Sequence, residues 1–328
     1  MAQYRAIFQN AYFKGLATAA VVTMGLAAGQ AQATALTDLA AASGDITITG
    51  GSDSGNANKW GSITVSGAAL TLEHNLTITG GAATDNYIKP KGDNLSIEAP
   101  EKNLTINIGS TGTASTDGFT LNTIAGSGST LSLNKVDVAK GLLVINNNAA
   151  DSTAQLNAKQ INVGTSGSTA ETVSAFVKLS KSGSFGTTLS NDTLLSANTQ
   201  LSIYKDGQIL AEKASSTANL TSTINAAVLN IDGGKIIAEG EDAQKASDLT
   251  INLISGTMTD GAINVNKGSN LKLDFQDSVN IKKDANVALD KKFDINSGSI
   301  DAKGKITVTG PGILSIQDGV VITGGTNG

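Results

Sequence analysis

The 328-residue sequence contains no cysteine, one histidine and a single arginine, Arg5. The absence of cysteine excludes a disulfide framework, a thiolate nucleophile and a cysteine-based zinc site. The one histidine, His74, has no second histidine with which to bind a metal, and we expect it at a solvent-facing corner. With almost no arginine, the chain also lacks the planar guanidinium group that recognises phosphate and carboxylate in two-point contacts.

Charged and aromatic residues are scarce as well, at 16% and 4% of the chain. Ordinary globular domains contain about 25% charged residues. The net charge is −5, and an acidic surface with few arginines and aromatics is unsuited to nucleic acid, which we exclude as a partner. Hydrophobic residues make up 40% of the chain, which is enough for a folded core and argues against wholesale disorder.

The first 33 residues have the features of a cleavable secretory signal. Arg5 and Lys14 form a basic start, the segment 15–28 is uninterrupted small and apolar residues, and Ala31-Gln32-Ala33 fits a cleavage site. The apolar run is shorter than the ~20 residues of a spanning helix, which makes a membrane anchor the weaker alternative, beside a buried N-terminal helix. Cleavage would leave 21 basic residues (23 − 2) and 28 acidic residues, a net charge of −7.

Beyond residue 35 the sequence repeats one short pattern of alternating apolar and polar residues. Examples are ITITGG from Ile46, LTLEHNLTITGG from Leu70, LTINIG from Leu104, LSLNKVDV from Leu131, LNIDGG from Leu229, LTINL from Leu249, LKLDF from Leu271 and ITVTG from Ile306. Strict alternation over four to six residues predicts β-strands that are buried on one face. We expect Ile, Val and Leu to point inward and Thr, Asn, Ser and Lys to point outward.

Asparagine or aspartate followed by leucine opens many of these predicted strands. The positions are Asn75, Asn94, Asn103, Asn219, Asp248 and Asn270. Asn and Asp tolerate left-handed backbone and hydrogen-bond to nearby main chain, so we expect them at corners. Their irregular spacing argues against a propeller or a leucine-rich array.

We therefore expect an all-β protein whose residues 34–328 form a parallel β-solenoid, or β-helix, of right-handed winding. The runner-up is a set of tandem β-sandwiches, but sandwiches normally use aromatic core anchors, and only eight aromatics follow residue 33. At an assumed ~22 residues per coil, the solenoid would have roughly 13 coils and a length of ~60 Å. The stretch at about 147–199 is less regular, and residues 172–181 are compatible with helix or strand.

Carboxylate groups are the only other candidates for chemistry. They are Glu239 with Glu241 and Asp242, Asp274 with Asp277, and Asp290 with Asp294. None forms the acidic cluster expected of a polysaccharide hydrolase on this fold, and we interpret them as solvated surface groups. The segment from Asp53 superficially resembles a calcium loop but has Gly55 and Ala57 at ligand positions. We expect no catalytic, cofactor-binding or metal-binding residue, and no enzymatic activity.

The signal, followed by cysteine-free, aromatic-poor phrases such as ANLTST, NLTITGG, LNIDGGKI and ITVTG, resembles the passenger of a Gram-negative autotransporter adhesin. The resemblance implies a right-handed β-helix on the outer surface that mediates adhesion or aggregation. The family's C-terminal membrane barrel does not occur up to Gly328. Because uncovered strand edges recruit other chains, we expect the C-terminal coil to continue in a longer protein or to be covered head to tail by another copy.

These features predict an exported protein of the cell surface, outer membrane or extracellular space of a Gram-negative bacterium. Its expected partners are a glycan, an extracellular matrix or itself, bound through strand faces and solenoid ends. Two other functions remain open at this point: a secreted polysaccharide lyase or hydrolase on the same fold, and a surface-layer or fibre subunit.

Overall fold

The computed structural model describes residues 46–48, 63–65, 69–71, 75–78, 87–90, 95–107, 118–123, 127–147, 154–170, 172–181, 194–213, 220–239, 247–267, 269–276, 292–303 and 305–325. These residues contain 22 β-strands and no helix. The proposed signal at 1–33 and the residues His74 and Asp53 lie outside this set.

The strands wind around one axis and form three faces, which we number in chain order within a coil. Six long strands turn from face 1 onto face 2: β6 (Leu95–Asn107), β8 (Ser129–Asn147, which continues onto face 3), β9 (Ala154–Val163), β11 (Leu194–Tyr204), β13 (Leu220–Asp232) and β15 (Ser247–Thr259). Face 1 also contains β3 (Ala69–Thr71), β17 (Leu271–Phe275) and β20 (Ile306–Thr309). Face 2 also contains β1 (Ile46–Ile48), β4 (Leu76–Ile78), β18 (Lys292–Ile295) and β21 (Ile313–Ile316).

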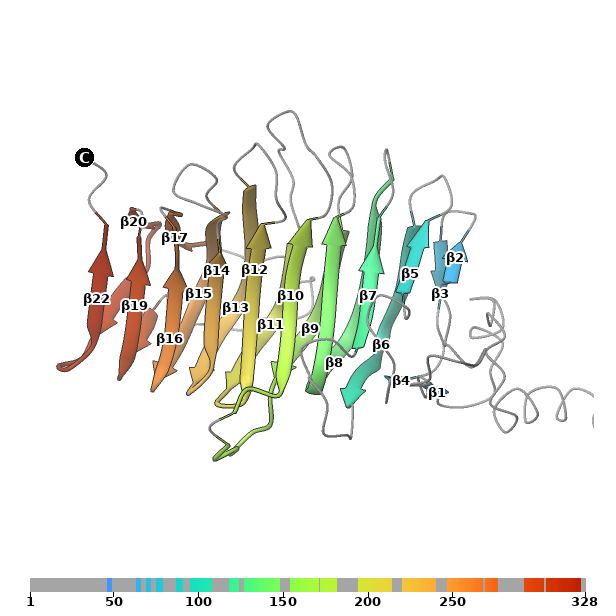
Figure 1. Cartoon of the computed structure of the whole chain (residues 1–328), viewed down its shortest axis with the longest axis horizontal. Helices are drawn as coiled ribbons and strands as arrows, with labels where there is room; N and C mark the ends of the chain where they lie inside the picture. The colour runs from blue at the N-terminus through green and yellow to red at the C-terminus, as the bar shows by residue number, and fades with distance from the viewer. Residues whose placement is uncertain are drawn as a thin grey trace, which may run out of the picture.

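Face 3 shows the stacking most directly (Figure 1). In order of stacking it contains β2 (Ile63–Val65), β5 (Tyr87–Pro90), β7 (Gly118–Asn122), the end of β8, β10 (Ala175–Lys181), β12 (Gly207–Lys213), β14 (Lys235–Glu239), β16 (Gly261–Val265), β19 (Gly298–Ala302) and β22 (Val321–Gly324). Each strand pairs in parallel with the strand one coil later. The described strands thus make ten coils of a parallel β-solenoid, which confirms the predicted fold class and rules out tandem sandwiches.

The coils vary in length more than the sequence suggested. Lys292 pairs with Ile313, 21 residues later, whereas Gln160 pairs with Gln200, 40 residues later. Ten coils have nine intervals of about 4.8 Å, so the stack is about 43 Å long. For the described strands the expected 13 coils and ~60 Å were wrong, because many successive coils are separated by more residues than the assumed 22, up to the 40 between Gln160 and Gln200.

The core is a continuous aliphatic stack that runs through all the coils whose side chains are described. One inward column consists of Ile78, Ile106, Val138, Val163, Ile203, Ile231, Met258 and Ile295, each at most 1% exposed. Phe119, Phe275 and Phe293 are the only aromatic residues among the described core residues. Burial of aliphatic side chains in this stack supplies the main favourable energy of the fold, as the alternating sequence predicted.

The less regular stretch of the sequence is still part of the stack. Residues 175–181, for which the sequence left helix or strand open, form β10. Strand β11 has a bulge between Ala197 and Gln200, and it pairs on either side with β9 and β13. The irregularity therefore arises from a bulge and from long connections, and the parallel pairing continues through it.

Candidate functional site: polar columns on faces 1 and 2

Outward side chains on face 2 form one unbroken polar column along the solenoid. Its described side chains are those of Thr105, Asp137, Asn162, Ser202, Asn230, Thr257, Asp294 and Ser315, each paired with the next, and Thr77 and Thr47 hold the same register on the two coils before Thr105. Because neighbouring strands are about 4.8 Å apart, the described side chains stand at that interval on the eight coils from Thr105 to Ser315, and Ser202 among them is buried, at 2% exposure. We call this the face-2 column.

Face 1 has an equivalent set, the face-1 column. Its described side chains are those of Glu98, Ser132, Asn157, Asn225, Asn252, Asp274 and Thr309, of which Ser132 and Asn225 are buried, and Thr71 and Ser196 hold the same register. No apolar residue interrupts either column. Thr, Asn and Ser thus face outward on faces 1 and 2, as the alternation predicted.

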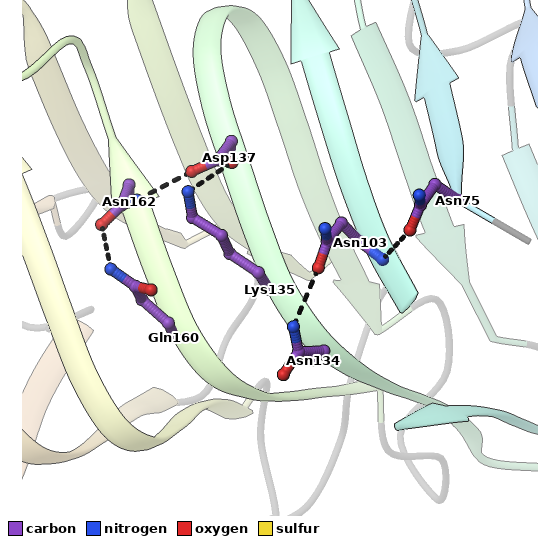
Figure 2. Close-up of polar contacts among 7 residues, drawn as sticks. All are labelled: Asn75, Asn103, Asn134, Lys135, Asp137, Gln160 and Asn162. Atoms are coloured by element: carbon purple, nitrogen blue, oxygen red, sulfur yellow. Dashed lines mark hydrogen bonds and ion pairs between the residues drawn. The ribbon is translucent and has the colours of Figure 1, made fainter. Parts of the chain in front are cut away.

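Hydrogen bonds between coils hold the side chains of the columns in place. The Asn162 side-chain amide donates to the Asp137 carboxylate over 2.7 Å, and the Asn252 side-chain amide donates to the Asn225 side-chain oxygen over 2.7 Å. Flanking residues add to the network, since Lys135 pairs with Asp137 at 2.9 Å (Figure 2). Such cross-strand pairs stabilise the sheet and reduce the rotamer freedom of the groups that face solvent.

The corners of the coils carry a second kind of polar ladder. The Asn103 backbone N–H donates to the Asn75 side-chain oxygen over 2.9 Å, and the Asn134 amide donates to the Asn103 side-chain oxygen over 3.0 Å (Figure 2). At another corner the Asn270 backbone N–H donates to Asp248 over 2.7 Å, and the Lys305 N–H donates to the Asn270 side-chain oxygen over 2.9 Å. For these residues the prediction that Asn or Asp before leucine marks a corner is confirmed.

The sequence did not reveal that such corner residues also bind the coil above. The side-chain oxygen satisfies a backbone N–H that leaves the regular strand ladder, and an unsatisfied buried N–H would be costly. The stacking depends on a contact between residues about one coil apart, which no local pattern reveals without the register.

Of the carboxylates considered for catalysis, the described ones, Glu239, Asp274 and Asp294, lie on three different faces. Asp274 lies in the face-1 column and is bonded to Lys272 at 2.6 Å, while Asp294 lies in the face-2 column and is bonded to Lys292 at 2.6 Å. Glu239 is exposed at the end of β14, and its expected neighbours at 241 and 242, like Asp277 and Asp290, lie outside the described residues. The described residues contain no group of three or more His, Cys, Asp or Glu that could hold a metal ion.

The hydrogen bond from Lys272 is the main reason that the pKa of Asp274 lies below its usual value, and Thr309 and Gln276 add to the effect. Because the folded-state pKa is lower than the unfolded one, the carboxylate stabilises the fold above the unfolded pKa. That contribution is lost as the pH falls through the folded value.

We therefore expect Lys272→Gln to raise the pKa of Asp274 towards its usual value and to move acid unfolding slightly to higher pH. Carbon-detected NMR titration of the carboxyl group measures the first effect directly. Lys235→Gln, at an exposed position of face 3, is the control and should leave the Asp274 titration unchanged. An unchanged Asp274 titration in the Lys272 variant would contradict the ion pair.

Face 3 differs from the other two because several of its outward residues are apolar. Val144, Lys178, Leu210 and Ile237 are paired in one outward column, and Leu142 and Phe176 are paired in the next. Leu142, Val144 and Phe176 pack together as a small cluster apart from the core. Burial among these residues lowers the pKa of Lys178.

The prediction that Leu, Val and Ile point only inward was therefore wrong on this part of face 3. The sequence carried a signal in the run Leu142-Leu143-Val144-Ile145, where four consecutive apolar residues break the alternation. Such a run supplies apolar side chains to both sides of a strand.

Asp206, at the corner between faces 2 and 3, is a buried residue that the sequence analysis did not single out. Its carboxylate accepts hydrogen bonds from the Thr165 backbone N–H over 2.8 Å and from the Ser174 hydroxyl over 3.4 Å. Its carbonyl oxygen accepts from the N–H groups of Ser174 and Ala175. These bonds hold both ends of the connection between β9 and β10 in place. Asp206 therefore has a structural role.

A small hollow nearby is lined by Gly167, Ser168, Tyr204, Lys205, Asp232, Gly233 and Asp260. The Asp260 carboxylate there accepts a hydrogen bond from the Ser297 hydroxyl over 2.8 Å. The residues around the hollow show no arrangement of nucleophile and base. The long polar columns are a more extensive feature, and we take them as the candidate functional surface.

Comparison of the chain with family models, curated proteins and solved structures finds no match. In the part of the chain that the structure describes, no helix is long and apolar enough to span a membrane.

Proposed function

We propose that the protein is a non-enzymatic, exported β-helical surface protein that mediates adhesion or aggregation. The observation that carries this proposal is the pair of unbroken polar columns on faces 1 and 2. The leader-like residues 1–33 and the resemblance to autotransporter passengers support a location on or outside the cell of a Gram-negative bacterium.

The ligand class that best suits the columns is a linear glycan lying along the solenoid axis. A column carries amide, hydroxyl or carboxylate groups about 4.8 Å apart, which are part-exposed or exposed at its described positions apart from the buried Ser202, Ser132 and Asn225. An extended polysaccharide presents hydroxyl groups at a similar regular interval, so several sugars would bind at once. Each hydrogen bond is worth little by itself in water, and many in parallel give firm attachment.

The proposal is tested with a double variant of the face-2 column, Asn162→Val with Asn230→Val. Both residues lie outward and part-exposed, so the core is untouched. Binding to immobilised neutral and acidic glycans, measured by surface plasmon resonance, should fall at least tenfold relative to the unchanged protein. The reason is that a ligand spanning several coils would lose its hydrogen bonds to two amide groups of the protein.

A matched control makes the same chemical change on face 3. Asn264→Val is also outward and part-exposed, and it should bind glycans as the unchanged protein does. Equal losses in the two proteins, or no glycan binding at all, would contradict the proposal. Scission of the polysaccharide during incubation would instead show an enzyme.

A further inference from the structure

Lysines on faces 1 and 2 occur in local pairs with aspartates. Leaving the corners of the coils aside, each outward lysine of the described strands on these faces is bonded to the aspartate two residues later on its own strand. The pairs are Lys135 with Asp137 at 2.9 Å, Lys272 with Asp274 at 2.6 Å and Lys292 with Asp294 at 2.6 Å. Side chains two residues apart on a strand lie on the same side of the sheet, so each pair is neutral where it meets solvent.

The aspartate of each pair stands in a polar column, and its lysine stands beside the column. Groups of the next coil also hold these carboxylates, since the Asn162 side-chain amide donates to Asp137 over 2.7 Å and the Ser315 hydroxyl donates to Asp294. The hydrogen bond from Lys292, together with that from Ser315, keeps the pKa of Asp294 below its usual value. This carboxylate is therefore ionised at neutral pH, and its lysine remains occupied.

At the described positions of the two columns, no two charged residues stand on neighbouring coils. Asp137 lies between Thr105 and Asn162, and Asp274 and Asp294 are likewise flanked by neutral polar residues. Like charges about 4.8 Å apart would repel one another, and this arrangement avoids the repulsion. The columns thus consist of neutral hydrogen-bonding groups with isolated carboxylates among them.

One carboxylate of the columns has no lysine. Glu98 accepts hydrogen bonds from the Ser96 hydroxyl over 2.9 Å and from the Ser132 hydroxyl over 3.3 Å, and it has no ion pair with a described residue. Away from the corners, the described strands of faces 1 and 2 therefore have an unpaired negative charge and no unpaired positive charge. The single arginine of the chain, Arg5, lies in the leader-like segment, so these faces also lack the group that binds carboxylate or sulfate in two-point contacts.

We infer that the ligand of the polar columns is an uncharged polysaccharide, and that glycans with carboxylate or sulfate groups are rejected. The inference rests on the proposed function and specifies the chemical class of its ligand. Hydroxyl and amide groups both donate and accept hydrogen bonds, as sugar hydroxyls do, so a neutral chain needs no opposite charge on the protein. A polyanion would bring negative charges against the carboxylates of the columns, and such like-charge contacts discriminate strongly against a partner.

The first test uses polymers that share a backbone and differ in charge. Hydroxyethyl cellulose is compared with carboxymethyl cellulose, and dextran is compared with dextran sulfate, by surface plasmon resonance. At low salt the unchanged protein should bind the neutral member of a pair at least tenfold more tightly than the acidic member. Binding of the neutral polymer should stay the same between about 10 mM and about 100 mM salt, although the Debye length falls from about 30 Å to about 10 Å.

The second test removes the aspartates of the two face-2 pairs. Asp137→Asn with Asp294→Asn keeps the size of both side chains and frees Lys135 and Lys292 beside the column. This variant should bind carboxymethyl cellulose and dextran sulfate at least tenfold more tightly than the unchanged protein does at low salt. The gain should shrink as the salt concentration rises, because it comes from exposed charges.

The matched control, Glu239→Gln with Asp301→Asn, changes the net charge by the same amount on face 3. It also frees a lysine, because Asp301 is bonded to Lys303 at 2.8 Å, but this lysine lies away from both columns. The control should bind the acidic polymers as weakly as the unchanged protein does.

The outcomes separate this inference from the proposed function. Equal or tighter binding of the acidic polymers by the unchanged protein, no gain in the face-2 variant, or an equal gain in the control would overturn the inference and leave glycan binding in place. If the unchanged protein binds none of the four polymers, the proposed function and the inference fail together.

Discussion

Replacing Gly298 with alanine is expected to lower the free energy of unfolding by about 3–4 kcal/mol, among the large effects of single substitutions. Gly298 opens β19 with a φ of +107°, a region that side chains rarely adopt. An added Cβ would also run into the carbonyl oxygen of Gly261 on the preceding coil. Since that oxygen belongs to the backbone, relief requires the two coils to move apart.

The control for Gly298 is Gly319→Ala, which separates the cost of the positive φ from the cost of the clash with the neighbouring coil. Gly319 has a φ of +88° but no atom within 4 Å of an added Cβ. Its substitution retains the cost of the backbone conformation, about 1 kcal/mol, without the clash. Urea unfolding followed by circular dichroism gives both values, and hydrogen exchange should show the Gly298 effect around β19 and β22. Equal destabilisation in the two variants would refute the close approach of the coils.

Gly298 belongs to a column of glycines where the chain enters face 3. An added Cβ at Gly207, Gly234 or Gly261 would likewise meet the backbone or a buried side chain of an earlier coil. Each glycine is therefore required by a residue far away in the sequence. A glycine near the start of a strand is visible in the sequence, but the atom that excludes a side chain there is not.

Periodicity, by contrast, was sufficient to predict the direction of most side chains. In LTINL from Leu249, LKLDF from Leu271 and LNID from Leu229, every leucine lies inward and is fully buried. The reason is physical, because a strand buried on one side must alternate with a period of two. The same reasoning failed for Leu142 and Val144, where apolar residues occupy both sides and the alternation disappears.

The sequence predicted which residue types lie on the candidate surface, but only the structure shows how they are arranged in columns. Alternation predicted that Asn162 and Asn230 would face outward. It did not predict that both stand in one column, because the residues between Asn162 and β11 comprise β10 and two connections whose lengths follow no repeat. The number of residues between successive coils decides which side chains stack, and the lengths of the surface loops do not appear in any periodic pattern.

The largest expected effect is that of Leu229→Asn, which should destabilise the protein by more than about 4 kcal/mol. Leu229 is fully buried and stacks between Leu201 of the preceding coil and Gly256 of the next. An asparagine there would lose the contacts of the leucine and would place an amide group in a column without hydrogen-bonding side chains. Because coils stabilise one another as nearest neighbours, the loss should spread to the coils on both sides.

Val228→Asn is the matched control, one residue earlier on the same strand. Val228 points outward and is part-exposed, with Gln200 and Ser255 as its neighbours. We expect a change within about 0.5 kcal/mol, because its surroundings are already polar and hydrated. Thermal and urea unfolding of the two variants measure the difference, and hydrogen exchange shows whether β11, β13 and β15 lose protection together. A Val228 variant as unstable as the Leu229 variant would mean that the two sides of this strand are not core and surface, and the stacked aliphatic core would have to be abandoned.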